Sequence, residues 1–231
     1  MILLERLIRS DCLPYNLIGD DDALSHFNQP SSYARFIVRQ MNVDDIYAKY
    51  LKNKTGLTVL DLGANVGLFS IYASPSASRI VSVEPTPSHI NIFKTLTKNI
   101  PNIELVQAAV SNRNAPVTFY LSTFNTTINS LFNHSNTGQI TVNGKTIKTI
   151  MDENNLNTVD FCKIDIEGSE MIAITDETLA EVSHRIKTIF IEVHPTNLPL
   201  QVNVNTLVGI FNRNGYSVEC IGVDTIVAQK I

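Results

Sequence analysis

The sequence predicts an α/β domain, with a mostly parallel sheet flanked by helices and an antiparallel hairpin at the carboxyl end. From about Thr58 onward, short apolar runs of strand length alternate with segments of helical length. This alternation is typical of parallel sheets, because parallel neighbours need a crossover connection. The last two runs, 216–222 and 225–230, are separated by only a few residues, so we expect them to pair as a hairpin.

Each element has its own signal in the chain. The five remaining strands are apolar runs of the kind found in strands that are buried on both faces, and they are expected over 58–65, 79–85, 102–111, 159–168 and 186–195. Helices are expected over 67–74, 87–100, 170–185 and 204–215. For the second helix, Thr86 can serve as the N-cap and Pro87 as the first helical residue.

Two segments interrupt this alternation. Residues 1–57 have no strand pattern and are expected to form a helical extension or lid before a domain over 58–231. The Thr- and Asn-rich segment over about 116–150 is interpreted as a β insertion. Within it, the sequence ITVNGKTI predicts a hairpin, because Asn143-Gly144 suits a type I′ turn.

Composition limits the classes of partner. The net charge is -4 and no run of Lys and Arg stands out, which argues against a nucleic-acid partner. No apolar run approaches the roughly 20 residues of a membrane span. Cys12, Cys162 and Cys220 are odd in number and widely spaced, so neither a disulfide framework nor a zinc cluster is predicted, and we expect a cytoplasmic protein. The oligomeric state has no signal in the sequence.

The loop Gly63-Ala64-Asn65-Val66-Gly67 lies between the first strand and its helix. Such a turn presents backbone N–H groups and the positive end of a helix to a ligand. The dinucleotide fingerprint G-x-G-x-x-G would have glycine where Asn65 stands. Asp61 would repel a phosphate, but it suits a cationic ligand with an amino group. These residues favour S-adenosylmethionine, which carries an α-amino group, a sulfonium and no phosphate.

Glu84 ends the second predicted strand. In doubly wound folds an acidic residue at this place hydrogen-bonds the hydroxyls of a ribose. Together with the loop after the first strand, Glu84 predicts a site for a nucleoside-type cofactor.

The motifs VLDLGANVGLFS, VSVEPTPSHINIFKTLTKN, LVQAAVS, VDFCKIDIEGSE and IFIEVHP, taken in this order, resemble the FkbM family of S-adenosylmethionine-dependent methyltransferases. The resemblance covers about Leu57 to Pro195 and is most specific in the pairing of DLGAN with the later KIDIEG. It implies a Rossmann-like class I methyltransferase fold. It also implies O-methyl transfer to a hydroxyl of a sugar or another small molecule.

The resemblance also implies roles for individual residues. Glu84 would hold the ribose, and Ala109 and Val110 would lie beside the adenine. The methionine end would be lined by the loop residues Asp61, Gly63, Ala64, Asn65 and Gly67.

Charged residues gather at the ends of the fourth and fifth predicted strands. Lys163, Asp165 and Glu167 alternate along one strand and therefore share a face, as do Glu192 and His194 on the next. An alcohol acceptor needs its proton removed, and His194 has the reference pKa that suits a general base. Asp165 and Glu167 would orient the hydroxyl. The five residues are therefore the catalytic candidates.

Other readings of these residues stay open. His194 before a proline could be an ordinary loop histidine, and Lys163 with Asp165 could be only a structural ion pair. Asp165, Glu167, Glu192 and His194 could also bind a divalent cation, but their spacing does not demand one, and we predict no metal. The remaining histidines are expected to be solvated, and they are His26, His89, His134 and His184.

Two other functions compete with methyl transfer. An NAD-dependent oxidoreductase would use the same fold, but Asn65 disfavours it. A module that binds S-adenosylmethionine without catalysis would not need the five charged residues at the strand ends.

Overall fold

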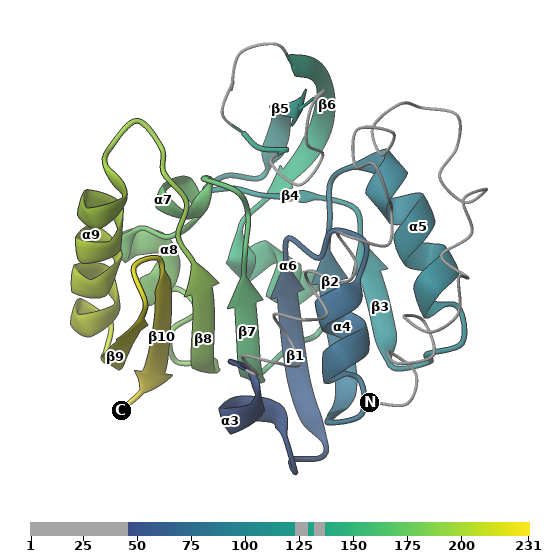
Figure 1. Ribbon diagram of the computed structural model, residues 1–231, viewed down its shortest axis with the longest axis horizontal. Coiled ribbons are helices and arrows are strands. Elements are labelled where there is room, and N and C mark those ends of the chain that lie inside the picture. Colours follow the sequence, from purple (N-terminus) through teal and green to yellow (C-terminus); the bar gives the residue numbers. More distant parts are fainter. Residues whose placement is uncertain (1–45, 123–128, 132–136) are drawn as a thin grey trace.

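The computed structural model describes residues 46–122, 129–131 and 137–231. Its main sheet has seven strands within these residues, in the order β3-β2-β1-β7-β8-β10-β9 (Figure 1). The strands are β1 (Leu57–Leu62), β2 (Ala77–Val83), β3 (Ile103–Val106), β7 (Val159–Ile164), β8 (Ile186–Glu192), β9 (Tyr216–Ile221) and β10 (Thr225–Lys230). Only β10 runs antiparallel to its neighbours β8 and β9. The predicted mostly parallel sheet and its C-terminal hairpin are confirmed.

Helices cover both faces of this sheet. One face packs against α3 (Ala48–Leu51) and α4 (Leu68–Ala73), with α5 (Pro87–Thr97) beside them. The other face packs against α6 (Ile147–Glu153), α8 (Asp176–Ala180) and α9 (Leu200–Arg213). Two separate apolar clusters result, one on each face of the sheet.

Strand periodicity determines which residue joins which cluster. Leu60 and Leu62 point to the face of α6 and α9, whereas Val59 points to the face of α3 and α4. Asp61 alternates with Leu60 and Leu62, so its side chain also points to the α4 face. This geometry, rather than the nearby loop, decides where the Asp61 carboxylate lies.

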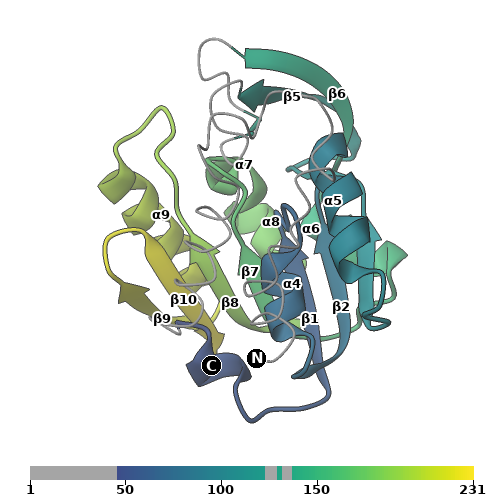
Figure 2. The same ribbon diagram turned by 45° about the vertical axis from the view of Figure 1, so that its right-hand side comes forward.

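A second, smaller sheet stands above the carboxyl ends of β1 and β7 in both views (Figures 1 and 2). Its order is β4-β6-β5, with β4 (Ala109–Val110), β5 (Ala115–Ser122) and β6 (Thr137–Lys145). The third predicted strand, 102–111, is therefore wrong as one element, because β3 and β4 belong to different sheets.

The predicted hairpin at Asn143-Gly144 is also wrong. Both residues lie inside β6, where they pair with Pro116 and Ala115 of β5. Gly144 has another reason to be glycine, since a Cβ there would lie 2.8 Å from the backbone oxygen of Ala115 and 2.9 Å from the Val117 side chain. Gly144, which suggested a turn, is therefore glycine because β5 and β6 pack closely there.

Two predicted helices have different bounds. The expected helix over 170–185 is two short helices, α7 (Glu170–Ala173) and α8, because Thr175 lies between them and caps α8. The last helix begins earlier than expected, at Leu200. Of the predicted N-terminal extension, only residues from 46 onward are described, and there Tyr47 and Tyr50 pack against Phe161.

Within the described part of the chain, no helix is long and apolar enough to cross a membrane. Of the cysteines, Cys162 is free and buried and Cys220 is free and exposed, whereas Cys12 lies outside the described residues.

Candidate active site

A cleft opens at the carboxyl ends of β1, β2, β7 and β8, below the small sheet. The predicted site residues that line it are Gly63, Ala64, Asn65, Glu84, Ala109, Val110, Lys163, Asp165, Glu167 and Glu192. Asp61, Gly67 and His194 do not line it. The fold thus brings together most of the residues singled out in the sequence, from four separate strand ends.

The glycines of the loop after β1 are required by neighbouring protein atoms. Gly63 has φ 84°, and a Cβ there would lie 1.8 Å from the backbone oxygen of Asp165. Gly67 has φ 90°, and its Cβ would lie 2.7 Å from the ring of Phe93. Asn65 also adopts a positive φ, 51°, which Asn tolerates better than most residues. Packing against β7 and α5 therefore explains both glycines without any ligand.

We expect Gly63→Ala to destabilise the fold by at least about 3 kcal/mol, because its Cβ would collide with a backbone atom that cannot move aside. Gly222→Ala is the matched control, since Gly222 also has a positive φ but no atom within 4 Å of the added Cβ. Urea unfolding of both variants separates the collision from the cost of the backbone conformation. Equal stabilities of the two variants would contradict this account of the loop.

Glu84 is buried at the floor of the cleft, with 5% of its surface exposed. Its carboxylate accepts hydrogen bonds from the backbone N–H of Asn65 (2.9 Å) and of Thr86 (2.8 Å). Burial alone would raise the pKa of Glu84, but the bonds from His89 and Thr86 outweigh it and hold the pKa below its usual value. The ionised carboxylate of Glu84 is therefore a hydrogen-bond acceptor in the cleft, as the sequence predicted.

His89 was expected to be solvated, and that prediction is wrong. The side chain is buried on the first turn of α5, and its Nδ1 lies 3.2 Å from Oε1 of Glu84. The expectation for His184 holds, since this residue is exposed, while His26 and His134 lie outside the described residues. Thr86 occupies the N-cap position of α5, but its side chain makes no capping bond.

Asp61 is fully buried beneath the loop rather than exposed in the cleft. Its Oδ2 accepts a hydrogen bond of 2.5 Å from Ser70 of α4, and its Oδ1 has no hydrogen-bond partner. Burial raises the pKa of Asp61 to about 6, although Lys163 and Ser70 act in the opposite direction. The structure does not bring this carboxylate into the cleft, because its position on β1 points it toward α4.

Lys163 and Asp165 form an ion pair at the end of β7, with Nζ 2.9 Å from Oδ2. Burial would lower the pKa of Lys163, but Asp165 and the other acidic groups around it raise the pKa well above its usual value. Lys163 is therefore an ammonium at neutral pH and not a base. Burial of Asp165 raises its own pKa, whereas Lys163 lowers it, and the pKa of Asp165 stays below its usual value.

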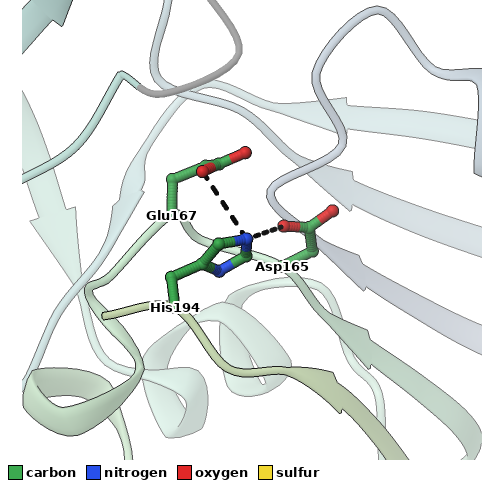
Figure 3. A group of neighbouring side chains, drawn as sticks. All are labelled: Asp165, Glu167 and His194. Carbon is green, nitrogen blue, oxygen red and sulfur yellow. Dashed lines mark ion pairs between the residues drawn. The ribbon is translucent and has the colours of Figure 1, made fainter. Parts of the chain in front are cut away.

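His194 lies close to Asp165 and Glu167, the two acidic residues that follow β7. Its Nε2 is 3.6 Å from Oε2 of Glu167 and 3.9 Å from Oδ1 of Asp165, and both dashed lines in Figure 3 converge on this nitrogen. Its Nδ1 lies 3.0 Å from Oε1 of Glu170, a fully buried carboxylate. Glu170 also accepts bonds from the backbone N–H groups of Ile166 and Gly168.

These neighbours change the acid–base character of the site. Burial alone would lower the pKa of His194, but Glu170, Asp165 and Glu167 raise it to about 10. His194 is thus an imidazolium at neutral pH, which counts against the general-base hypothesis. Burial and the nearby Asp165 raise the pKa of Glu167 to about 8. For the same two reasons the pKa of Glu192 is raised, and its Oε1 accepts a hydrogen bond of 3.2 Å from Tyr47.

Sequence reasoning missed three residues of the site, namely His89, Glu170 and Tyr47. Glu170 begins a helix, which is an ordinary place for an acidic residue, so no pattern singles it out. Tyr47 comes from the segment before β1, and only the tertiary fold brings it to Glu192. His89 lies five residues after Glu84, and that spacing carries no known signal.

The model of the family described as "Methyltransferase FkbM domain" matches residues 61–218. None of the curated proteins matches the chain.

The fold of this chain is similar to that of solved structures. An S-adenosylmethionine-dependent methyltransferase from Aquifex aeolicus superposes with a TM-score of 0.50 and 14% identity, covering 90% of this chain and 96% of that one. A precorrin-6y C5,15-methyltransferase from Geobacter metallireducens GS-15 has a TM-score of 0.49 and 18% identity, covering 81% of this chain and 88% of that one. At these identities the likeness concerns the fold alone.

Proposed function

The chain belongs to the FkbM family of S-adenosylmethionine-dependent methyltransferases, and we propose that it methylates a hydroxyl group of a sugar or another small molecule. The observation that carries the proposal is the composition of one cleft. A buried, ionised Glu84 lies among the loop residues at one part of it, and the charged residues Lys163, Asp165, Glu167 and Glu192 line another.

The residues present fit S-adenosylmethionine. The carboxylate of Glu84 accepts bonds from the backbone of Asn65 at Oε2 and from Thr86 and His89 at Oε1. A ribose hydroxyl that enters the cleft is assigned to Oε2, which accepts fewer of these bonds. Ala109, Val110 and Phe119 provide an apolar wall suited to an adenine ring. Gly63, Ala64 and Asn65 are assigned to the methionine end.

When bound, S-adenosylmethionine supplies an activated methyl group, whose bonding pair stays on sulfur as the new C–O bond forms. The main task of the protein is then to align the acceptor and to remove its proton. We assign proton removal to Glu192. It lines the cleft, the direct ion pair of Lys163 is with Asp165 rather than with Glu192, and the hydroxyl of Tyr47 fixes its orientation. In contrast, the lone pair of His194 is occupied by a proton at neutral pH.

Asp165 serves as the positioning group in this proposal. It lines the cleft and Lys163 holds its Oδ2, so the carboxylate is fixed at the wall where the acceptor hydroxyl would bind. The cytoplasmic location and the absence of nucleic-acid and membrane partners remain predictions from composition.

The proposal is tested by incubating the purified chain with methyl-labelled S-adenosylmethionine and a panel of small hydroxyl compounds, amines and carboxylic acids. We expect label in base-stable ethers of the hydroxyl compounds. Transfer only to amines or only to carboxylic acids would contradict O-methylation of an alcohol. Cofactor binding without transfer to any class would favour the non-catalytic module.

A further inference from the structure

We propose that Asp165, Glu167 and His194 together bind one divalent cation at the wall of the cleft. One ligand atom from each residue lies within 4.8 Å of the other two. Of these three residues the proposed methyl transfer gives a role only to Asp165, as a positioning group, and occupancy of the cation site is measurable without turnover.

The distances between Nε2 of His194 and the two carboxylate oxygens fit a shared ion better than direct hydrogen bonds. Nε2 of His194 is 3.6 Å from the Glu167 oxygen and 3.9 Å from the Asp165 oxygen, and both distances are too long for hydrogen bonds. Two atoms held by one ion at about 2.1 Å each are at most about 4.2 Å apart. The pairs around Nε2 therefore already lie within the span of a single ion, and Figure 3 shows both carboxylates facing that nitrogen.

Glu170 provides a second, independent indication. A histidine that binds a metal usually donates its other ring N–H to a carboxylate, which fixes the ring and its tautomer. Nδ1 of His194 faces Oε1 of Glu170 at 3.0 Å, and Glu170 is fully buried with no hydrogen-bond partner for its Oε2. This arrangement directs Nε2 toward Asp165 and Glu167, where a bound ion would displace the proton that Nε2 otherwise carries.

The charges around the site also favour a cation. Four carboxylates, those of Asp165, Glu167, Glu170 and Glu192, surround His194, and Lys163 is the cation paired with one of them. When all four carboxylates are ionised, their charge exceeds that of Lys163 and a protonated His194 together by two. Lys163 binds Oδ2 of Asp165, whereas Oδ1 is buried without a hydrogen-bond partner. An oxygen ligand thus remains available to an ion.

The donor set indicates the type of ion. Two carboxylates and one imidazole suit Mn²⁺, Fe²⁺ or Zn²⁺, and the single nitrogen makes Ca²⁺ a poorer fit. Because Asp165 and Glu167 line the cleft, an ion held by them would be within reach of an acceptor bound there. An ion there would bind the hydroxyl oxygen of the acceptor and lower its pKa.

The test is a titration of the purified full chain, freed of metal by a chelator, with Mn²⁺ followed by electron paramagnetic resonance. We expect one bound Mn²⁺ per chain, displaced by Zn²⁺. Asp165→Asn and His194→Gln should each weaken binding at least tenfold. Glu170→Gln should weaken it about 10–100-fold, because the ring of His194 loses its ionic partner.

His184→Gln and Glu181→Gln are the matched controls, since both residues are exposed and outside the cleft. Circular dichroism and thermal unfolding identify any variant that fails to fold, and Glu167→Gln then replaces it in the series. The absence of stoichiometric binding of both Mn²⁺ and Zn²⁺ would overturn the proposal. Binding that is equal in the wild type, Asp165→Asn and His194→Gln would overturn it as well.

Discussion

Replacing Glu192 by Gln is expected to lower the rate of methyl transfer by roughly 10²–10⁴-fold, because proton removal by a positioned carboxylate contributes about that much. Gln keeps the size of the side chain and its hydrogen bond with Tyr47, but it cannot accept a proton. S-adenosylmethionine affinity should not change, since Glu192 lies at the end of β8 and not beside Glu84. Single-turnover rates with labelled cofactor measure the effect.

Two controls make the Glu192 result interpretable. Glu181→Gln removes an exposed carboxylate outside the cleft and should leave the rate unchanged. Tyr47→Phe removes only the hydroxyl that orients Glu192, so a smaller loss is expected. A loss under about threefold in Glu192→Gln would mean that alignment alone suffices, and it would end the assignment of Glu192 as the base.

His194→Ala distinguishes the remaining roles of that residue. If His194 were the general base, the rate would fall in this variant while a chelator would leave the wild type active. If His194 binds a cation, chelation and His194→Ala should both lower the rate, and added Mn²⁺ should restore only the chelated wild type. The contact of Nδ1 with Glu170 and the closeness of Nε2 to Asp165 and Glu167 make the second outcome the expected one.

Glu84→Gln is expected to weaken binding of S-adenosylmethionine at least tenfold. A hydrogen bond to a charged group contributes roughly 1.5–3 kcal/mol, and about 1.4 kcal/mol corresponds to a factor of ten. Part of the loss is indirect, because the same carboxylate accepts bonds from the backbone of Asn65 and Thr86. Isothermal titration calorimetry measures the dissociation constant.

A control is needed because Glu84 also forms hydrogen bonds within the protein and can contribute to its stability. His89→Gln removes the histidine that bonds Glu84 but leaves the carboxylate in the cleft, so its effect on cofactor binding should be smaller. Unfolding curves of both variants establish that they fold. An unchanged dissociation constant in a folded Glu84→Gln variant would show that Glu84 only orders the backbone around it.

The sheet could be predicted from sequence because its signal is local. Runs such as Leu57–Leu62 and Val159–Ile164 are mostly apolar, as is typical of strands covered on both faces, and their alternation with helices indicates parallel order. The small sheet could not be predicted in detail. Its strand β6 contains Asn143-Gly144, whose local preference for a turn was overridden by pairing with β5 on one side and β4 on the other.

The cleft could be predicted in outline, since strand ends of a parallel sheet meet at one edge. What the sequence could not show is how side chains share that edge. Asp61 points toward Ser70 because of strand periodicity, and Gly63 is glycine because the backbone of Asp165, just after β7, leaves no room for a Cβ. The acid–base properties of His194 depend on Glu170, whose contact with it exists only in the tertiary fold. A reference pKa was therefore a poor guide to this histidine.

Calorimetric titration of the purified chain with S-adenosylmethionine, S-adenosylhomocysteine and NAD tests the central claim most directly, because it asks which nucleoside the cleft accepts. The account predicts that one molecule of either S-adenosyl compound binds per chain and that NAD does not bind, since Asn65 stands at the place of the middle glycine of the dinucleotide motif and the buried Asp61 carboxylate lies beneath the loop. Binding of NAD without binding of either S-adenosyl compound would contradict the account.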